Sequence, residues 1–375
     1  MDIPMDALVE ILVRLPLIAR LEARLVCRLW REVVTQRTWT DMRRLGNILA
    51  VDSEGRAHFT GAGHCLRSQA WSTGNRGRGR MSIVGTCNGI VCLCYDGDWG
   101  GGYPGGDVQL VNPATDYGFG LPELPLSDTA VMQKPGGWRW HETYVFARHP
   151  TTRQYKIVHI PCHLDRFCKP GMVQVFTLGE ASWREVHAGP DSRCTPGACR
   201  LTDVDGTVYW VTKGRRKIMS LDLGDERVKP VEPLPVPVRP ARCRRRQRRR
   251  GDGMGPCLTN VHGRLGAAVE DDDGESVTVW VLQGERWSRR YVVKAHRLAM
   301  PYFAHGDCVL TLGSAGKNFA VYRHNVSEAE RSQGSVVQIG DKDRHNGEVL
   351  SSSYRIDRTF SYVRTTARPW SVTRS

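Results

Sequence analysis

From about residue 47 onward, short runs of β-favouring residues alternate with glycine, proline and asparagine turns. This pattern constrains the fold more than any other feature of the sequence. Three pairs of turn residues stand directly before such runs: Asn88-Gly89, Asp205-Gly206 and His262-Gly263. Asn-Gly and Asp-Gly pairs favour the two-residue turns that join antiparallel strands, and His-Gly is a weaker signal of the same kind. Helical periodicity is scarce after residue 45, which disfavours a parallel sheet with crossover helices. We therefore expect a large all-β domain of short antiparallel strands.

A barrel, a sandwich and a propeller all satisfy this pattern, and chain length favours the propeller. The chain has 375 residues, and at about 40–50 residues per blade the β-rich part allows about six to eight blades. A faint unit also recurs, in which a turn of small residues leads into a β run and then a Trp or an Asp-Leu pair. It occurs at 173–183, 208–223 and 277–287.

The first 45 residues show the apolar spacing of helices instead of strands. Four apolar side chains lie at i, i+3, i+4 and i+7: Leu8, Ile11, Leu12 and Leu15. They predict an amphipathic helix over 6–15 that ends at Pro16. Leucines then recur at every fourth residue from 21 to 29, so further short helices are expected. So few residues rarely bury a sufficient core, and the apolar seam should therefore bind another chain or pack on the C-terminal domain.

The net charge of +14 and the pI of 9.4 raise nucleic acid, an acidic partner or an anionic surface as counterparts. Eight arginines and no acid lie within 239–250, after a proline-rich stretch. Such a block predicts an exposed, disordered insert at 230–256. Its core comprises Arg242, Arg244, Arg245, Arg246, Arg248, Arg249 and Arg250. Nuclear import, contact with RNA or acidic proteins, and no specific role all remain open for this tract. Because it holds most of the excess charge, nucleic-acid binding by the folded surface is not expected.

The 12 cysteines are too sparse for a disulfide scaffold, and no apolar run is long enough to span a bilayer. The N-terminus is acidic where a secretory signal would be basic. We expect a protein of the cytoplasm, the nucleus or both, without a membrane partner. The Cys and His groups at 87–94, 162–168 and 194–199 lack the paired spacing of zinc sites, so neither a metal nor a cofactor is expected. Alternation would place Cys92 and Cys94 on one strand face as small apolar fillers.

The segment Gly85-Thr-Cys87-Asn-Gly89 has the form of a nucleophile elbow, which needs a helix directly after the turn. The residues that follow are β-like, so a hairpin is the better interpretation. The glycine-rich stretch 97–106 lacks the Gly-Lys-Ser/Thr of a phosphate-binding loop. We therefore predict no catalytic residues and no enzyme.

The sequence resembles two known families in different parts of the chain. Three N-terminal segments together resemble the F-box: the run Ile3-Pro-Met-Asp-Ala-Leu-Val-Glu-Ile-Leu12, the pair Leu15-Pro16 and the final segment Arg24-Leu-Val-Cys-Arg-Leu-Trp30. Ile3, Ile18 and Arg20 depart from the family pattern. The resemblance implies that ten residues bind a Skp-family adaptor: Pro4, Leu8, Ile11, Leu12, Leu15, Pro16, Leu25, Val26, Cys27 and Trp30.

The β-rich part resembles the F-box-associated domain of plant F-box proteins. Four short motifs occur in the order found in that family: Cys87 to Leu93, Asn112-Pro-Ala-Thr115, Tyr155-Lys-Ile-Val158 and Asp205 to Trp210. His149, the glycines near 100 and the Arg tract depart from that pattern. The resemblances imply an all-α F-box at 1–45, a propeller-like domain at 46–363 and a tail at 364–375.

The function they imply is that of a substrate receptor in an SCF-type cullin–RING ubiquitin ligase, which joins the adaptor and its cullin to an unidentified target protein. The alternative is a propeller protein outside any ligase that binds a ligand or RNA, with an incidental helical front end.

Overall fold

The computed structural model describes most of the β-rich part and a smaller share of the N-terminal part. The described residues are 4–14, 23, 26, 30, 33, 47–52, 56–61, 64–69, 80–96, 107–113, 115, 117–125, 140–162, 168–194, 201–212, 217–234, 256–261, 263–270, 276–293, 297–298, 308–315, 318–325, 336–339 and 348–362.

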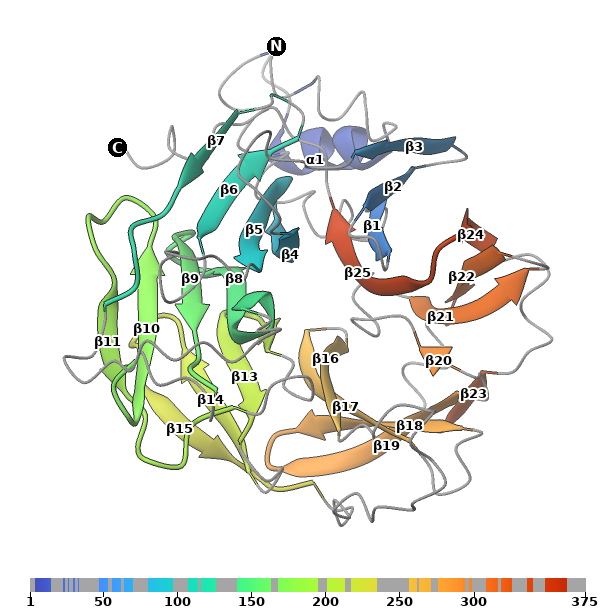
Figure 1. The fold of residues 1–375 in the computed structure, drawn as a ribbon. Helices are drawn as coiled ribbons and strands as arrows, with labels where there is room; N and C mark the ends of the chain where they lie inside the picture. The colour runs from blue at the N-terminus through green and yellow to red at the C-terminus, as the bar shows by residue number, and fades with distance from the viewer. Residues whose placement is uncertain are drawn as a thin grey trace.

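The described strands form six sheets around a ring, as expected of a propeller (Figure 1). Sheet 1 contains β1 (Asn47–Asp52), β2 (Ala57–Gly61), β3 (His64–Gln69) and β25 (Ile356–Tyr362). Sheet 2 contains β4 (Arg80–Cys87), β5 (Ile90–Asp96), β6 (Val108–Asn112) and β7 (Tyr117–Gly120). Sheet 3 contains β8 (Tyr144–Arg148), β9 (Tyr155–His159), β10 (Met172–Thr177) and β11 (Arg184–His187).

The second half of the ring repeats this plan with one added strand. Sheet 4 contains β12 (Thr202–Val204), β13 (Thr207–Val211), β14 (Ile218–Asp222) and β15 (Val228–Val231). Sheet 5 contains β16 (Cys257–Val261), β17 (Arg264–Glu270), β18 (Val277–Gln283), β19 (Arg286–Val293) and β23 (Val337–Ile339). Sheet 6 contains β20 (Arg297–Leu298), β21 (Cys308–Ala315), β22 (Asn318–Asn325) and β24 (Glu348–Ser352). The helical elements that the structure describes are α1 (Met5–Arg14) and the 3₁₀ turn η1 (Trp140–Thr143).

Two of the turns read from the sequence form as predicted. Asn88 and Gly89 join β4 to β5 with φ of 50° and 78°, and Asp205 and Gly206 join β12 to β13 with φ of 48° and 80°. Positive φ at both central residues is the geometry of the favoured two-residue hairpin turn. The hairpin interpretation of Gly85–Gly89 is therefore confirmed, because Cys87 ends one strand and Ile90 begins the next.

Strand β5 shows how the sheets pack. Cys92 and Cys94 belong to the core cluster that includes Trp140 and Tyr144, while Val91 and Leu93 belong to a second cluster with Phe360. Neighbouring sheets thus bury both faces of this strand, which explains its continuous apolar run. The prediction that Cys92 and Cys94 share one face as apolar fillers is confirmed.

The ring closes by pairing the beginning of the β-rich part with its end. Strand β25 runs antiparallel to β1, with Asn47 opposite Tyr362 and Asp52 opposite Ile356. The chain enters β1 at Asn47, so we call the face of the ring at Asn47 and Tyr362 the linker face. The opposite face, at Asp52 and Ile356, is called the distal face.

Several contacts between neighbouring sheets lie on the linker face. The Thr86 hydroxyl donates to the carbonyl of Ser361, which joins sheets 2 and 1. The side-chain Nδ2 of Asn88 donates to the Tyr155 hydroxyl at 2.9 Å and joins sheets 2 and 3. The turn at Gly206 packs directly against Pro150, which joins sheets 3 and 4.

Two features were not predicted. Strand β15 continues through Pro230 to Val231, so the expected insert at 230–256 does not begin at residue 230. Pro230 fits because β15 is an edge strand, where a missing N–H leaves no ladder bond unmade. Strand β23 comes from the connection between β22 and β24 and pairs in parallel with β19 of sheet 5.

Candidate functional site

Helix α1 carries the first candidate binding surface. Pro4 precedes the helix, Asp6 supplies an acid in its first turn, and the amide of Leu8 donates to the carbonyl of Pro4 at 3.0 Å. An acid near the positive N-terminal end stabilises a helix. The helix over 6–15 predicted from apolar spacing is thus confirmed within one residue at each end.

The apolar side chains of α1 divide between two faces. Leu8 and Leu12 are only 1% and 0% exposed. Ile11 is 46% exposed, and it shares a face with the exposed residues Pro4 and Ala7. An apolar face left in solvent beside a buried one is typical of a surface that binds another chain. Ala7 was not among the predicted binding residues, although its spacing from Pro4 and Ile11 carries the signal.

The next helical stretch repeats this division in the four residues described there. Ala23 and Val33 are buried, Trp30 is half-buried, and Val26 is 63% exposed. Val26 and Ile11 are therefore the most exposed large apolar side chains in the described N-terminal residues. Leu15, Pro16, Leu25 and Cys27 lie outside the described residues.

Several cysteines considered as a nucleophile or as metal ligands are buried in the described part of the β domain. Burial raises the pKa of the Cys92 thiol, which leaves it protonated and unreactive at neutral pH. Cys162, Cys168 and Cys194 are buried as well. No three His, Cys, Asp or Glu side chains of the described part gather as a metal site would require. His163 and Cys199, which sequence reasoning grouped with these cysteines, lie outside that part.

The arginines of 239–250 also lie outside the described residues. The chain just before them is described as far as Leu234. The Trp287 indole donates to the carbonyl of Glu232 at 3.0 Å, and Leu234 packs on the cluster between sheets 4 and 5. The chain is therefore held on sheet 5 up to Leu234, just before the segment that carries the Arg tract. No helix of the described residues combines the length and the apolar character needed to cross a bilayer.

Comparison with known proteins identifies the family of the β-rich part. Residues 63–360 match the family described as the F-box associated beta propeller domain. The chain belongs to this F-box-associated propeller family. Residues 1–39 match the F-box domain, so both resemblances drawn from the sequence motifs are confirmed. Helix α1 lies within the F-box match, and all six sheets contribute strands to the propeller match.

A similar protein is known in a plant. The F-box protein At3g07870 of Arabidopsis thaliana is 24% identical over 335 residues, which cover 78% of this chain and 72% of that protein.

Comparison with solved structures finds matches of low similarity. A crystal structure of a nidogen/laminin complex contains a chain with a TM-score of 0.42 and 9% identity, covering 85% of this chain and 99% of that chain. TolB from Acinetobacter baumannii has a TM-score of 0.42 and 8% identity, covering 80% of this chain and 67% of that chain.

Proposed function

We propose that this F-box protein is the substrate-receptor subunit of an SCF-type cullin–RING ubiquitin ligase. The F-box docks on a Skp-family adaptor, and the propeller holds a target protein. The subunit itself catalyses no reaction and contributes proximity and orientation. Localisation in the cytoplasm, the nucleus or both remains a prediction.

The exposed apolar face of α1 carries this proposal. Ile11 and Val26 remain in solvent although Leu8 and Leu12, on the same helix as Ile11, are fully buried. Exposed apolar side chains of this size gain free energy when a partner covers them. The buried leucines would instead maintain the helical fold, so the ten predicted adaptor-binding residues fall into contact residues and core residues.

A pair of charge substitutions tests this division. The full chain carrying Ile11→Asp and Val26→Asp is compared with the unaltered chain for binding to a purified Skp-family adaptor. We expect at least a tenfold loss of affinity, because a partner surface would have to bury two carboxylates. Thermal melting should change little, since both positions are exposed.

Tyr117→Asp is the matched control. Tyr117 is also 46% exposed, but it lies on β7 of the propeller. It should leave adaptor affinity unchanged. The proposal fails if the intact chain binds no Skp-family adaptor, or if the Ile11/Val26 variant binds it as tightly as the unaltered chain does.

A further inference from the structure

Strand β23 is added to sheet 5 from another part of the chain. The other described sheets contain four strands each, but in sheet 5 a fifth strand covers the edge of β19. This strand lies in the connection between β22 and β24, which both belong to sheet 6. In Figure 1 the short red strand β23 lies beside the orange strands of sheet 5. Sheet 5 thus accepts an extended segment that its own consecutive strands do not supply.

The contact that holds β23 is small. It pairs with β19 at three positions, from Val337 opposite Tyr291 to Ile339 opposite Val293, whereas β18 pairs with β19 at seven. The two strands run parallel, and parallel pairing is slightly less stable per residue than antiparallel pairing. Val336, directly before β23, is 42% exposed. Strand β23 is therefore held more weakly than the strands on which it lies.

Neither sheet depends on β23 for its own order. Strands β22 and β24 pair directly with each other, over residues 319–322 of β22. Strand β19 is fixed by β18 and by the core between sheets 5 and 6, which contains Tyr291, Val293 and Val309. Release of β23 would therefore break its own three pairs and leave both sheets in place.

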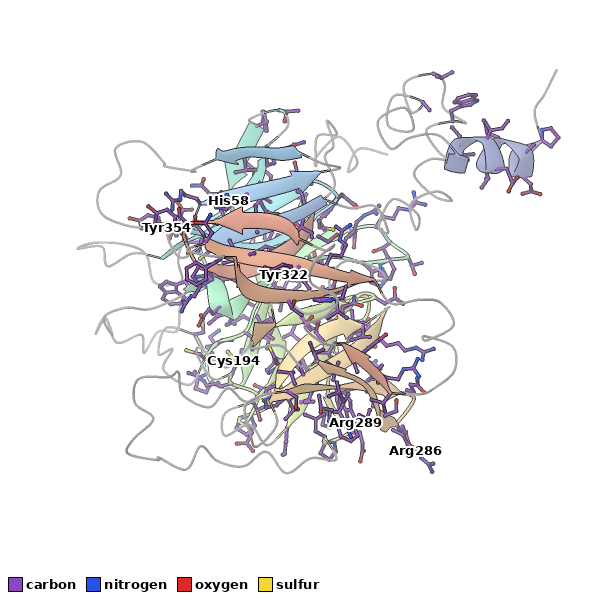
Figure 2. All side chains as sticks on the ribbon, turned by 90° about the vertical axis from the view of Figure 1, so that its right-hand side faces the viewer. His58, Cys194, Arg286, Arg289, Tyr322 and Tyr354 are labelled. Carbon is purple, nitrogen blue, oxygen red and sulfur yellow. The ribbon has the colours of Figure 1, made fainter. Side chains whose placement is uncertain are left out.

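The covered edge lies toward the distal face of the ring. The Asn260 side chain, near the end of β16, donates to the carbonyl of Asp203 beside the linker-face turn at Gly206. The strands of sheet 5 alternate in direction from there, so β19 begins at the linker face and ends at the distal face. Figure 2 shows Arg286 and Arg289 of β19 at the outer rim of the propeller. Because β23 pairs with the last three residues of β19, it lies at the end remote from the linker to the F-box.

We propose that the β19 edge at 291–293 is a strand-addition site for an extended, β-branched segment of the target protein, and that β23 occupies this site in the free protein. The inference rests on the proposed function, since it names the surface and the chemistry by which the propeller holds its target. Strand β23 itself defines the occupant, because it is an extended backbone within the uncharged run Val-Val-Gln-Ile at 336–339.

The geometry favours exchange of one strand for another. A strand added to a sheet edge binds through main-chain hydrogen bonds, and side chains at alternate positions select its sequence. A target strand that pairs with more than three residues of β19 exceeds the contact that β23 makes. Because β18 and the core already hold β19, binding does not have to order the acceptor. Strand β23 lowers the apparent affinity for the target by the fraction of chains in which it covers the edge.

Peptide binding to variants of the full chain tests the exchange. The probe is a fluorescent peptide of residues 334–341, Gly-Ser-Val-Val-Gln-Ile-Gly-Asp. Val337→Gly with Ile339→Gly weakens β23, because glycine disfavours a strand. We expect this variant to bind the peptide about tenfold more tightly than the unaltered chain does, since the internal competitor is weaker. Replacing 326–347 with a short glycine–serine linker removes the competitor and should give the tightest binding.

Two controls isolate the edge. Val228→Gly with Val231→Gly makes the same change in β15, the outermost strand of sheet 4. It should leave the peptide affinity within about a factor of two, because β15 does not cover β19. The second control is the same peptide methylated on the backbone nitrogens at 337–339. It keeps every side chain but cannot donate to the ladder, so it should bind about tenfold more weakly.

Amide hydrogen exchange provides a readout that needs no peptide. A strand that opens without unfolding its sheet exchanges faster than the strands that remain. In the unaltered chain, we expect the amides of 337–339 to exchange at least about tenfold faster than those of β18.

Four results would overturn the strand-addition site. Exchange at 337–339 as slow as in β18 would show that β23 leaves only when the sheet unfolds. Equal binding of the methylated peptide would exclude a ladder. Failure of the glycine variant to bind the peptide more tightly, while its melting transition is retained, would show that β23 is no competitor. A dimer of the unaltered chain that the linker replacement abolishes would make a second copy the occupant. Adaptor binding is measured separately on each variant, so failure of the ligase assignment is distinguishable from failure of this site.

Discussion

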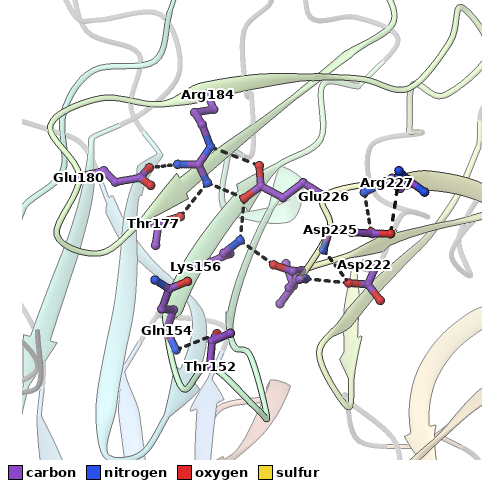
Figure 3. Close-up of polar contacts among 12 residues, drawn as sticks. Thr152, Gln154, Lys156, Thr177, Glu180, Arg184, Asp222, Asp225, Glu226 and Arg227 are labelled. Carbon is purple, nitrogen blue, oxygen red and sulfur yellow. Dashed lines mark hydrogen bonds and ion pairs between the residues drawn. The ribbon is translucent and has the colours of Figure 1, made fainter.

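Lys156 and Glu226 join sheets 3 and 4 through a charge pair that is largely removed from water. The Lys156 ammonium lies 2.6 Å from the Glu226 carboxylate and also donates to the carbonyl of Leu223, and its side chain is only 5% exposed. Arg184 contacts the same carboxylate from β11 (Figure 3). Burial opposes the charge of Glu226, but hydrogen bonds from Arg184 and Lys156 outweigh it and lower its pKa. Glu226 thus accepts from two cations of sheet 3.

Glu226→Gln should therefore destabilise the propeller. Removing one partner of a buried pair leaves the other charge unpaired, which typically costs about 3 kcal/mol. Adding Lys156→Met to this variant should recover part of the loss, because no buried charge then remains. Urea unfolding at pH 7 measures both effects.

The pH dependence of this loss provides a check. Because the folded-state pKa of Glu226 lies below its ordinary value of 4.5, the pair contributes fully above pH 4.5. Its contribution disappears as the pH falls through the lowered pKa. The stability difference between the unaltered chain and Glu226→Gln should narrow in that range, and a difference that stays constant down to pH 3 would contradict the role of this carboxylate.

At the scale of elements, the tight turns also serve as contacts between sheets. Gly206 has a φ of +80°, and a Cβ added there would lie 2.4 Å from the Cδ of Pro150 on the neighbouring sheet. Gly263 has a similar φ of +77°, but an added Cβ would meet no atom within 4 Å. The two glycines share the backbone requirement and differ in packing.

Gly206→Ala and Gly263→Ala should therefore differ in their effect on stability. Positive φ alone should reduce the free energy of unfolding of Gly263→Ala by about 1 kcal/mol. Gly206→Ala adds the displacement of Pro150, for a total of about 2–4 kcal/mol. Denaturant unfolding of both variants tests this, and equal losses would show that the contact with Pro150 is easily relieved.

Local chemistry explains which elements the sequence predicts. Asn88-Gly89 and Asp205-Gly206 identify hairpins because the turn preference resides in the two residues themselves. Nothing local to Pro230 shows that it ends up on an edge strand, because that depends on its pairing with Met219. The parallel strand β23 was missed for the same reason, since three residues carry no periodic pattern and their partner lies far away in the sequence.

The candidate sites follow the same rule. The spacing of Ile11 with Leu8 and Leu12 predicts an apolar helix, but only the fold shows which side remains exposed. Strands β19 and β23 are separated in the chain by β20, β21 and β22 of sheet 6, and only the placement of sheet 6 beside sheet 5 brings them together. No motif in either strand could have indicated their contact.

At the scale of the whole molecule, the ring depends on strand β25. This strand lies at the edge of sheet 1 toward the ring centre (Figure 1). Its side chains enter the cores on both sides, with Ile356 in one cluster and Phe360 in the other. The Arg358 guanidinium also donates to the carbonyl of Ile83 in sheet 2, at 2.8 Å.

Ending the chain after Ser353 should therefore abolish cooperative unfolding. Ile356 and Phe360 each contribute about 1.5–3 kcal/mol through burial, and the loss of the β1–β25 ladder adds to this. The total is comparable to the stability of an ordinary domain. Ending the chain after Val363 retains β25 and should preserve the melting transition of the full chain. A sharp transition in the shorter product would contradict the dependence on β25.

The pairing of β1 with β25 also sets an order of events during synthesis. Strand β1 leaves the ribosome well before β25, the strand that completes its sheet, because the rest of the ring is translated between them. At about 5–20 residues per second, the interval is on the order of 15–60 seconds. During that time Leu49 and Val51 lack the neighbour that covers them in the finished ring. Nascent chains of this protein should therefore be clients of ribosome-associated chaperones until β25 has been translated, and stop codons placed before β25 should yield products that are degraded.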